Sequence, residues 1–160
     1  MQERRVPDCC MILRWKGERM KPLAVVFVIL LGMAATCQED SNVKPPVTKA
    51  DLQIVKRARK ILDSPAKWNR KDNRECPQGE KTFSLYCALE EATKEVSGDF
   101  KHRGAAMQEA RFVIDEIAPN RSKYNHRLMD YNNDPTTTWA DVQKFFKLLK
   151  ARIGKQVTSH

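Results

Sequence analysis

The densest group of potential metal ligands in this sequence lies at residues 130–141 (DYNNDPTTTWAD). Oxygen-bearing side chains occupy positions 1, 3, 5, 9 and 12 of this stretch, as they do in a calcium-binding EF-hand loop. Pro135 stands where that loop requires glycine, and the last ligand is an aspartate instead of the longer glutamate. The alternative interpretation is an Asx-rich turn followed by a capped helix. In the first interpretation the calcium ligands are Asp130, Asn132, Asp134 and Asp141.

His126 lies just before this stretch, and Glu90 and Glu91 supply neighbouring carboxylates on an earlier segment. An imidazole beside carboxylates is a set of groups that can act as acid and base. A small hydrolase or metal-binding protein that uses the Asp130–Asp134 turn with His126 and a glutamate is therefore one hypothesis. The three histidines lack metal-ligand spacing, and the sequence contains no nucleophile-elbow, P-loop or dinucleotide-binding motif. Apart from calcium, we expect no cofactor.

The N-terminal region has the pattern of an export signal. The apolar run at residues 23–37 (LAVVFVILLGMAATC) follows Lys21 and precedes acidic residues. Fifteen residues suit a signal peptide better than a bilayer-spanning helix, which needs about 20. We therefore expect residues 1–37 to be an export segment, with 1–19 an upstream extension of a natural start at Met20. The protein would be periplasmic, secreted or anchored to the membrane through its N-terminus.

Three fates of the export segment stay open. The sequence AATC at 34–37 is similar to a bacterial lipoprotein box, in which case Cys37 carries the lipid. Plain cleavage after Ala34 is the second interpretation, and an uncleaved anchor is the third.

Cys76 and Cys87 lie in the exported part, where thiol pairs tend to oxidise. A disulfide between them would stabilise the fold by about 2–3 kcal/mol. The other interpretation is two separate thiols, with Cys87 as a small core residue of a helix.

The charge pattern bears on the partners. The chain has a net charge of +9, and its basic and acidic residues are interspersed. That pattern is typical of a solvated surface, and with export it argues against a nucleic-acid partner. The partners we expect are the membrane surface or an envelope protein.

Hydrophobic periodicity predicts an all-α domain, a small bundle of four to five short helices after the export signal. Residues 38–47 read as a flexible tether that ends in Pro-Pro, residues 48–154 as the helical domain, and 155–160 as a disordered tail. A long polar connection, 64–79, follows the first helix, and Trp68 and Cys76 are the residues expected to fix it in place. The expected helices are 49–62, 80–97, 103–117, 120–131, and a last one that ends at Ile153, before Gly154. Capping boxes are expected at the start of the first helix (Thr48 with Asp51) and of the last (Thr138 with Asp141).

One set of residues carries a resemblance to a known family. Trp68 after the first helix, Cys87-Ala88-Leu89 in the second, Asn133-Asp134, Thr138 and Asp141-Val142 together resemble the bacterial family catalogued as domain of unknown function 6197, over about residues 50–153. The chain departs from that family's pattern at Glu90-Glu91, where the pattern has Gly-Ala. The resemblance implies a small, mainly helical domain and no known activity.

The sequence therefore favours a non-catalytic binding or envelope protein, with the hydrolase or metal-binding protein as the alternative. The candidate functional residues are Trp68, Cys87, His126, Asn133 and Asp134.

Overall fold

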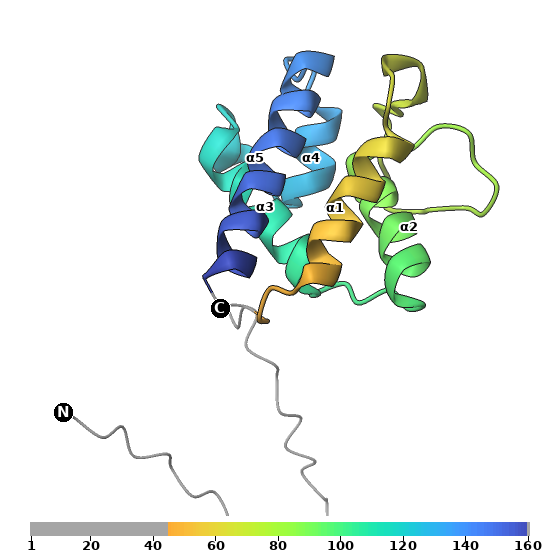
Figure 1. The fold of residues 1–160 in the computed structure, drawn as a ribbon. Coiled ribbons are helices and arrows are strands. Elements are labelled where there is room, and N and C mark those ends of the chain that lie inside the picture. Colours follow the sequence, from red (N-terminus) through yellow and green to blue (C-terminus); the bar gives the residue numbers. More distant parts are fainter. Residues whose placement is uncertain (1–44, 160) are drawn as a thin grey trace, which may run out of the picture. The chain divides into compact units, whose positions relative to one another are not determined.

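The computed structural model describes residues 45–159. The predicted export segment, with Cys37, and most of the predicted tether lie outside these described residues. Within them the chain forms five α-helices and two single 3-10 turns, so the predicted all-α class is confirmed (Figure 1). No helix within residues 45–159 is long and apolar enough to cross a bilayer. The elements are α1 (Lys49–Ile61), η1 (Pro65–Lys67), α2 (Leu85–Ser97), α3 (Ala105–Ile117), η2 (Arg121–Lys123), α4 (Arg127–Asn133) and α5 (Trp139–Thr158).

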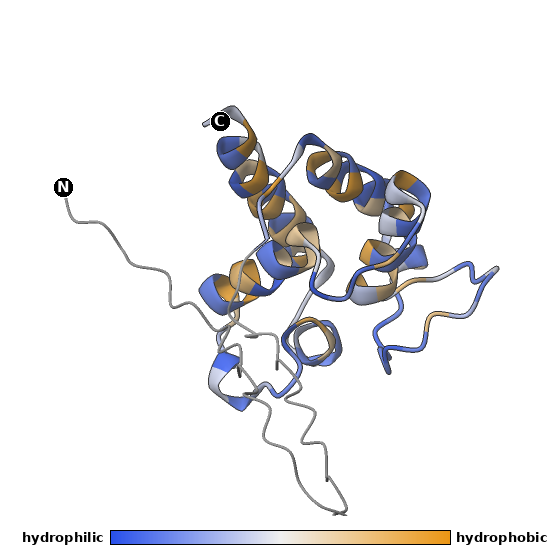
Figure 2. Ribbon diagram, turned by 90° about the horizontal axis from the view of Figure 1, so that it is seen from below, coloured by the Kyte–Doolittle hydropathy of each residue, from blue (hydrophilic) through white to orange (hydrophobic). Residues whose placement is uncertain are grey.

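The apolar sides of the helices face one another and form one core (Figure 2). Helix α1 packs against α2 and α5, and α3 packs against α5 and α4. The aromatic rings of Phe145 and Phe146 on α5 are fully buried at the centre of this arrangement. Because the helices bury a continuous apolar stripe, the domain needs no sheet to complete its core.

Helix α2 begins at Leu85, five residues later than predicted. Phe83 is unavailable to a helix because its backbone pairs with the segment after α1. Its N–H donates to the Lys67 carbonyl (2.8 Å), and its carbonyl accepts from Asn69 N–H (2.9 Å). Ser84 then caps the helix, since its hydroxyl oxygen accepts the Cys87 N–H at 3.1 Å. At the other end, Gly98 terminates α2 as predicted, with a left-handed φ of 77°.

The helix predicted at 120–131 is wrong in both its bounds and its continuity. The chain makes the short turn η2, breaks, and starts α4 at Arg127. The break is stabilised by the Asp130 carboxylate, which accepts the N–H groups of Asn125 (2.6 Å) and His126 (2.7 Å). Consequently Asn132 and Asn133, which the sequence placed in a turn, form the last turn of a helix.

The predicted end at Gly154 is also wrong, and so is the disordered tail for most of its length. Helix α5 continues through Gly154 to Thr158. The extra turn is stabilised because Val157 packs against the core and the Thr158 hydroxyl donates to the carbonyls of Gly154 and Lys155.

Both predicted capping boxes are present, and the one at the start of α1 also makes a hydrogen bond to another helix. Within residues 45–159 the Asp141 carboxylate accepts hydrogen bonds only from Thr138, at the start of its own helix. The buried Asp51 carboxylate accepts from Thr48 through Oδ2 and from Ala106 N–H of α3 through Oδ1 (3.0 Å). Asp51 therefore joins the start of α1 to the start of α3.

We predict that Asp51→Ala lowers the free energy of unfolding by about 3 kcal/mol, because it removes a cap and leaves the buried Ala106 N–H unpaired. The matched variant Asp141→Ala removes only a cap and should cost about 1 kcal/mol. Urea unfolding followed by circular dichroism measures both. Equal losses would contradict the role of Asp51 as a link between two helices.

Candidate functional site

The segment from Ser64 to Ser84 is the longest stretch of the described chain without a regular α-helix. It leaves α1, makes the turn η1, and returns to α2 through a wide loop (Figure 1). A loop of this length has many backbone groups that need partners. Its two ends close on each other through the bridge between Trp68 and Phe83. The remaining contacts come from α4, α2 and the turn before α5.

Asn132 provides the central contact. Its side chain is fully buried, and its Oδ1 accepts from the Trp68 indole N–H (2.8 Å) and from Leu85 N–H (3.1 Å). Its Nδ2 donates to the Asn69 carbonyl (2.9 Å). One amide side chain on α4 therefore holds the beginning of the 64–84 segment and the first residue of α2, to which the segment returns.

Asn133 makes the next contact along the segment. Its Oδ1 accepts from Asp72 N–H and its Nδ2 donates to the Asp72 carbonyl, both at 2.7 Å. The side-chain amide thus pairs with the backbone of Asp72 as a neighbouring strand would. Asn133 is used for positioning, and both of its polar atoms are occupied.

Arg70 ties the segment to the turn before α5. Its Nη2 donates to the carbonyls of Asp134, Pro135 and Thr137 at 3.1–3.2 Å. Its guanidinium also lies over the Trp68 ring, 5.1 Å from the centroid. The turn at 134–137, which the sequence analysis interpreted as part of a calcium-binding loop, therefore binds the Arg70 side chain of the 64–84 segment.

Both oxygens of the Asp134 carboxylate accept hydrogen bonds from other groups of the protein. Oδ1 accepts from the Thr136 N–H and hydroxyl, and Oδ2 accepts from Asn120 Nδ2 and the Tyr124 hydroxyl. These donors, the Thr136 hydroxyl first among them, hold the pKa of Asp134 far below its usual range. Burial and the same carboxylate raise the pKa of Tyr124. Asp134 remains charged and stabilises the turn.

A disulfide fixes the far end of the segment. Cys76 and Cys87 are bonded, with their Cα atoms 5.4 Å apart, so the loop is attached to the first turn of α2. The bridge occupies the sulfur of Cys87, which is buried in the core.

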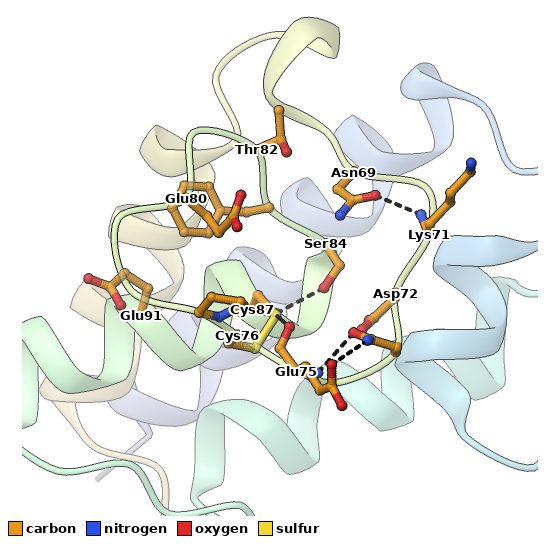
Figure 3. Close-up of a pocket in the computed structure, with 13 residues that line it drawn as sticks. Asn69, Lys71, Asp72, Glu75, Cys76, Glu80, Thr82, Ser84, Cys87 and Glu91 are labelled. Atoms are coloured by element: carbon orange, nitrogen blue, oxygen red, sulfur yellow. Dashed lines mark hydrogen bonds between the residues drawn. A yellow bond between two sulfur atoms is a disulfide. The ribbon is translucent and has the colours of Figure 1, made fainter.

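These contacts shape a pocket of about 200 Å³ between the 64–84 segment and the start of α2 (Figure 3). Among the residues that line it, Lys71 is the one basic side chain, and it extends away from the pocket (Figure 3). The acidic side chains that line it are Asp72, Glu75, Glu80 and Glu91. The pocket is therefore electronegative, a setting that favours a cationic group.

Asp72 is the buried acid of this pocket, with 6% of its surface exposed. Oδ1 accepts from Arg74 N–H (2.7 Å), whereas the buried Oδ2 has no hydrogen-bond partner among the described residues. Burial raises the pKa of Asp72, and the Arg74 amide and the Ser84 hydroxyl nearby oppose the shift. A buried carboxylate oxygen without a donor is costly, and a cationic donor would relieve that cost.

The structure does not assemble the predicted calcium site. Asn132 lies inside a helix, and the oxygens of Asp130, Asp134 and Asp141 accept from protein donors in three different places. Within residues 45–159 no group of three or more His, Cys, Asp or Glu side chains has metal-binding geometry.

The acid–base arrangement proposed around His126 is absent as well. His126 is exposed at the start of α4 and lines a different cavity from the carboxylates discussed above. Neither Asn133 nor Asp134 lines that cavity. Of the candidate residues, the structure brings Trp68, Cys87, Asn133 and Asp134 to the 64–84 segment and leaves His126 apart.

Sequence reasoning missed three residues of this site. Asn132 was considered only as a metal ligand, and Arg70 and Asp72 were not singled out. Their partners across the site lie 47 to 67 residues away along the chain, so no local pattern marks them. The length of the polar connection between two helices was the one signal available.

The fold and the site define a class: a small all-α domain whose α1–α2 connection is fixed by a disulfide and a buried asparagine. Residues 46–152 match the model of a family of unknown function, DUF6197, and the chain belongs to this family. The resemblance seen in the sequence is thereby confirmed. No curated protein and no solved structure matches the chain.

We predict that Asn132→Ala lowers the free energy of unfolding by about 3 kcal/mol, because it leaves the Trp68 and Leu85 N–H groups and the Asn69 carbonyl without partners. The exposed Asn125 side chain provides the control, and Asn125→Ala should change stability by less than about 0.5 kcal/mol. Urea unfolding followed by tryptophan fluorescence measures both. A loss below 1 kcal/mol for Asn132→Ala would show that the segment is held by other means.

Proposed function

We propose that this protein is an exported, non-catalytic binding domain whose acidic pocket takes a cationic group, the ammonium or guanidinium of a basic side chain on an envelope protein. The observation that carries the proposal is the pocket lining, which holds the carboxylates of Asp72, Glu75, Glu80 and Glu91 and in which the buried Oδ2 of Asp72 has no hydrogen-bond partner among the described residues. A guanidinium or ammonium supplies both the positive charge and the hydrogen-bond donors that such a site lacks.

The chemistry of the pocket supports binding over catalysis. No histidine lines it, and the Ser84 hydroxyl oxygen is engaged as the cap of α2. A serine nucleophile would need a neighbouring base to activate it. The hydrolase hypothesis also required His126 to meet Asn133 and Asp134, which lie elsewhere.

The proposal of export is based on the sequence pattern of residues 20–40. The disulfide between Cys76 and Cys87 is consistent with it. Disulfides persist mainly in oxidising compartments outside the cytoplasm. An exported domain would meet its partner at the envelope.

We expect N-acetyl-lysine methylamide and N-acetyl-arginine methylamide to bind the full chain in isothermal titration calorimetry, and the neutral N-acetyl-glutamine methylamide not to bind. Glu80→Gln removes one pocket charge and should weaken binding of the cationic probes about threefold to tenfold. Asp99→Asn, which removes one exposed negative charge outside the pocket, is the matched control and should leave the affinity within twofold.

Equal affinity of Glu80→Gln and Asp99→Asn would show that only the overall charge matters. Equal affinity for the neutral and cationic probes would refute recognition of a cation.

The intact mass of the protein purified from its native cells tests export. We expect a chain shortened before Cys37 with a diacylglyceryl mass, or one shortened after Ala34 without lipid, and in either case a gain of about 2 Da on reduction, since a disulfide takes up two hydrogens. Recovery of the complete 160-residue chain from the cytoplasmic fraction would contradict export.

A further inference from the structure

A second cavity, of about 230 Å³, lies beside the loop before Cys76, and its lining is strongly basic. Neither aspartate nor glutamate is among the residues that line it. The same loop contributes to both cavities, since Asp72, Asn73 and Glu75 line the acidic pocket and Arg74 lines this one. The basic side chains of the cavity are Arg74, His102, Arg111, Arg121, His126 and Arg127.

Arg111 is held in a fixed position in the wall of this cavity. Its side chain is partly buried, and Nη1 donates to the His102 carbonyl (3.1 Å) and to Gln108 Oε1 (2.7 Å). Burial lowers its pKa, and the positive charges of Arg127 and Arg103 act in the same direction. The fold therefore keeps a guanidinium in an environment that already carries excess positive charge.

The hydrogen bonds of His102 leave a donor on Tyr86. Arg111 Nη2 lies 3.0 Å from His102 Nε2, and a guanidinium can only donate, so Nε2 is the unprotonated nitrogen. In the neutral ring Nδ1 then carries the hydrogen and donates to the Tyr86 hydroxyl oxygen, 3.2 Å away. Partial burial and the nearby arginines lower the pKa of His102, which favours this neutral ring. The hydroxyl hydrogen of Tyr86 is left to donate to a ligand.

Arg74 completes the set. It has a left-handed φ of 63° at the loop position two residues before the disulfide. Its guanidinium makes no hydrogen bond or ion pair with another described residue. By contrast, Arg121 and Arg127 both pair with Asp115, which is partly exposed and does not line the cavity. The cavity thus gathers four guanidinium groups, and the nearby carboxylates of Asp115, Asp130, Glu90 and Asp72 lie outside its lining.

We propose that this cavity is a binding site for an oxyanion, the phosphate group of a soluble phosphomonoester or of an anionic lipid headgroup. Guanidinium groups bind phosphate oxygens through paired N–H donors, and the Tyr86 hydroxyl adds a neutral donor. The site is separate from the acidic pocket, so it does not depend on the proposed function.

The test is a titration of the full chain with inorganic phosphate, followed by ³¹P NMR or calorimetry, and with phosphatidylglycerol vesicles, followed by co-sedimentation. Arg74→Gln should weaken binding about tenfold, because a charge-assisted hydrogen bond is lost without disturbing a contact inside the protein. Tyr86→Phe, which keeps the buried ring, should weaken it about threefold to tenfold. Lys147→Gln removes the same charge from the exposed face of α5 and should leave the affinity within twofold.

The two probes distinguish the sources of the phosphate group. Binding of free phosphate that Arg74→Gln weakens identifies a soluble ligand, whereas weakened binding of vesicles alone identifies a lipid headgroup. Failure of both probes to bind the wild-type chain would overturn the proposal, and so would equal binding by Arg74→Gln and Lys147→Gln.

Discussion

The buried side-chain amide of Asn132 is the contact on which the candidate site depends. It accepts two N–H groups and donates to one carbonyl, and these partners are Trp68 and Asn69 near the start of the 64–84 segment and Leu85, the first residue of α2. A buried amide of this kind holds its partners in one geometry, since any displacement leaves polar groups unpaired. Asn133 and Arg70 extend the same arrangement outward along the segment.

The disulfide complements this network at the other end of the segment. Asn132 and Asn133 fix the segment against α4, and Cys76–Cys87 fixes it against α2. Between these attachments the chain presents carboxylates to one cavity and Arg74 to another. The two cavities have opposite charge and share one supporting loop, so both depend on the same few contacts for their shape.

The helices were predictable because their signals are local. Apolar residues at helical spacing gave α1 and α3 within two residues of their bounds, and both capping boxes lie where the sequence put them. The end of α5 was missed because Gly154 is tolerated inside a helix whose next turn packs on the core. The break before α4 was missed because it depends on the Asp130 carboxylate capping backward onto His126.

The site was predictable only in its components. Sequence reasoning selected Trp68, Cys87, Asn133 and Asp134, and all four contact or hold the 64–84 segment or its docking turn. The chemistry of Asn132 and Asp134 was misjudged because a side-chain oxygen that could bind a metal ion cannot be distinguished in the sequence from one that accepts hydrogen bonds from protein donors. In the folded chain the donors come from distant residues, such as the indole N–H of Trp68, and no spacing rule places them.

The central claim, that these contacts hold a segment without a regular α-helix in a fixed shape, is tested most directly by native-state hydrogen exchange measured by NMR on the oxidised protein. The amides of Asp72, Phe83 and Leu85 donate to Asn133, Lys67 and Asn132, and we expect them to exchange nearly as slowly as the amides in the middle of α2. Exchange of these three amides at the rate of an exposed loop would contradict the account.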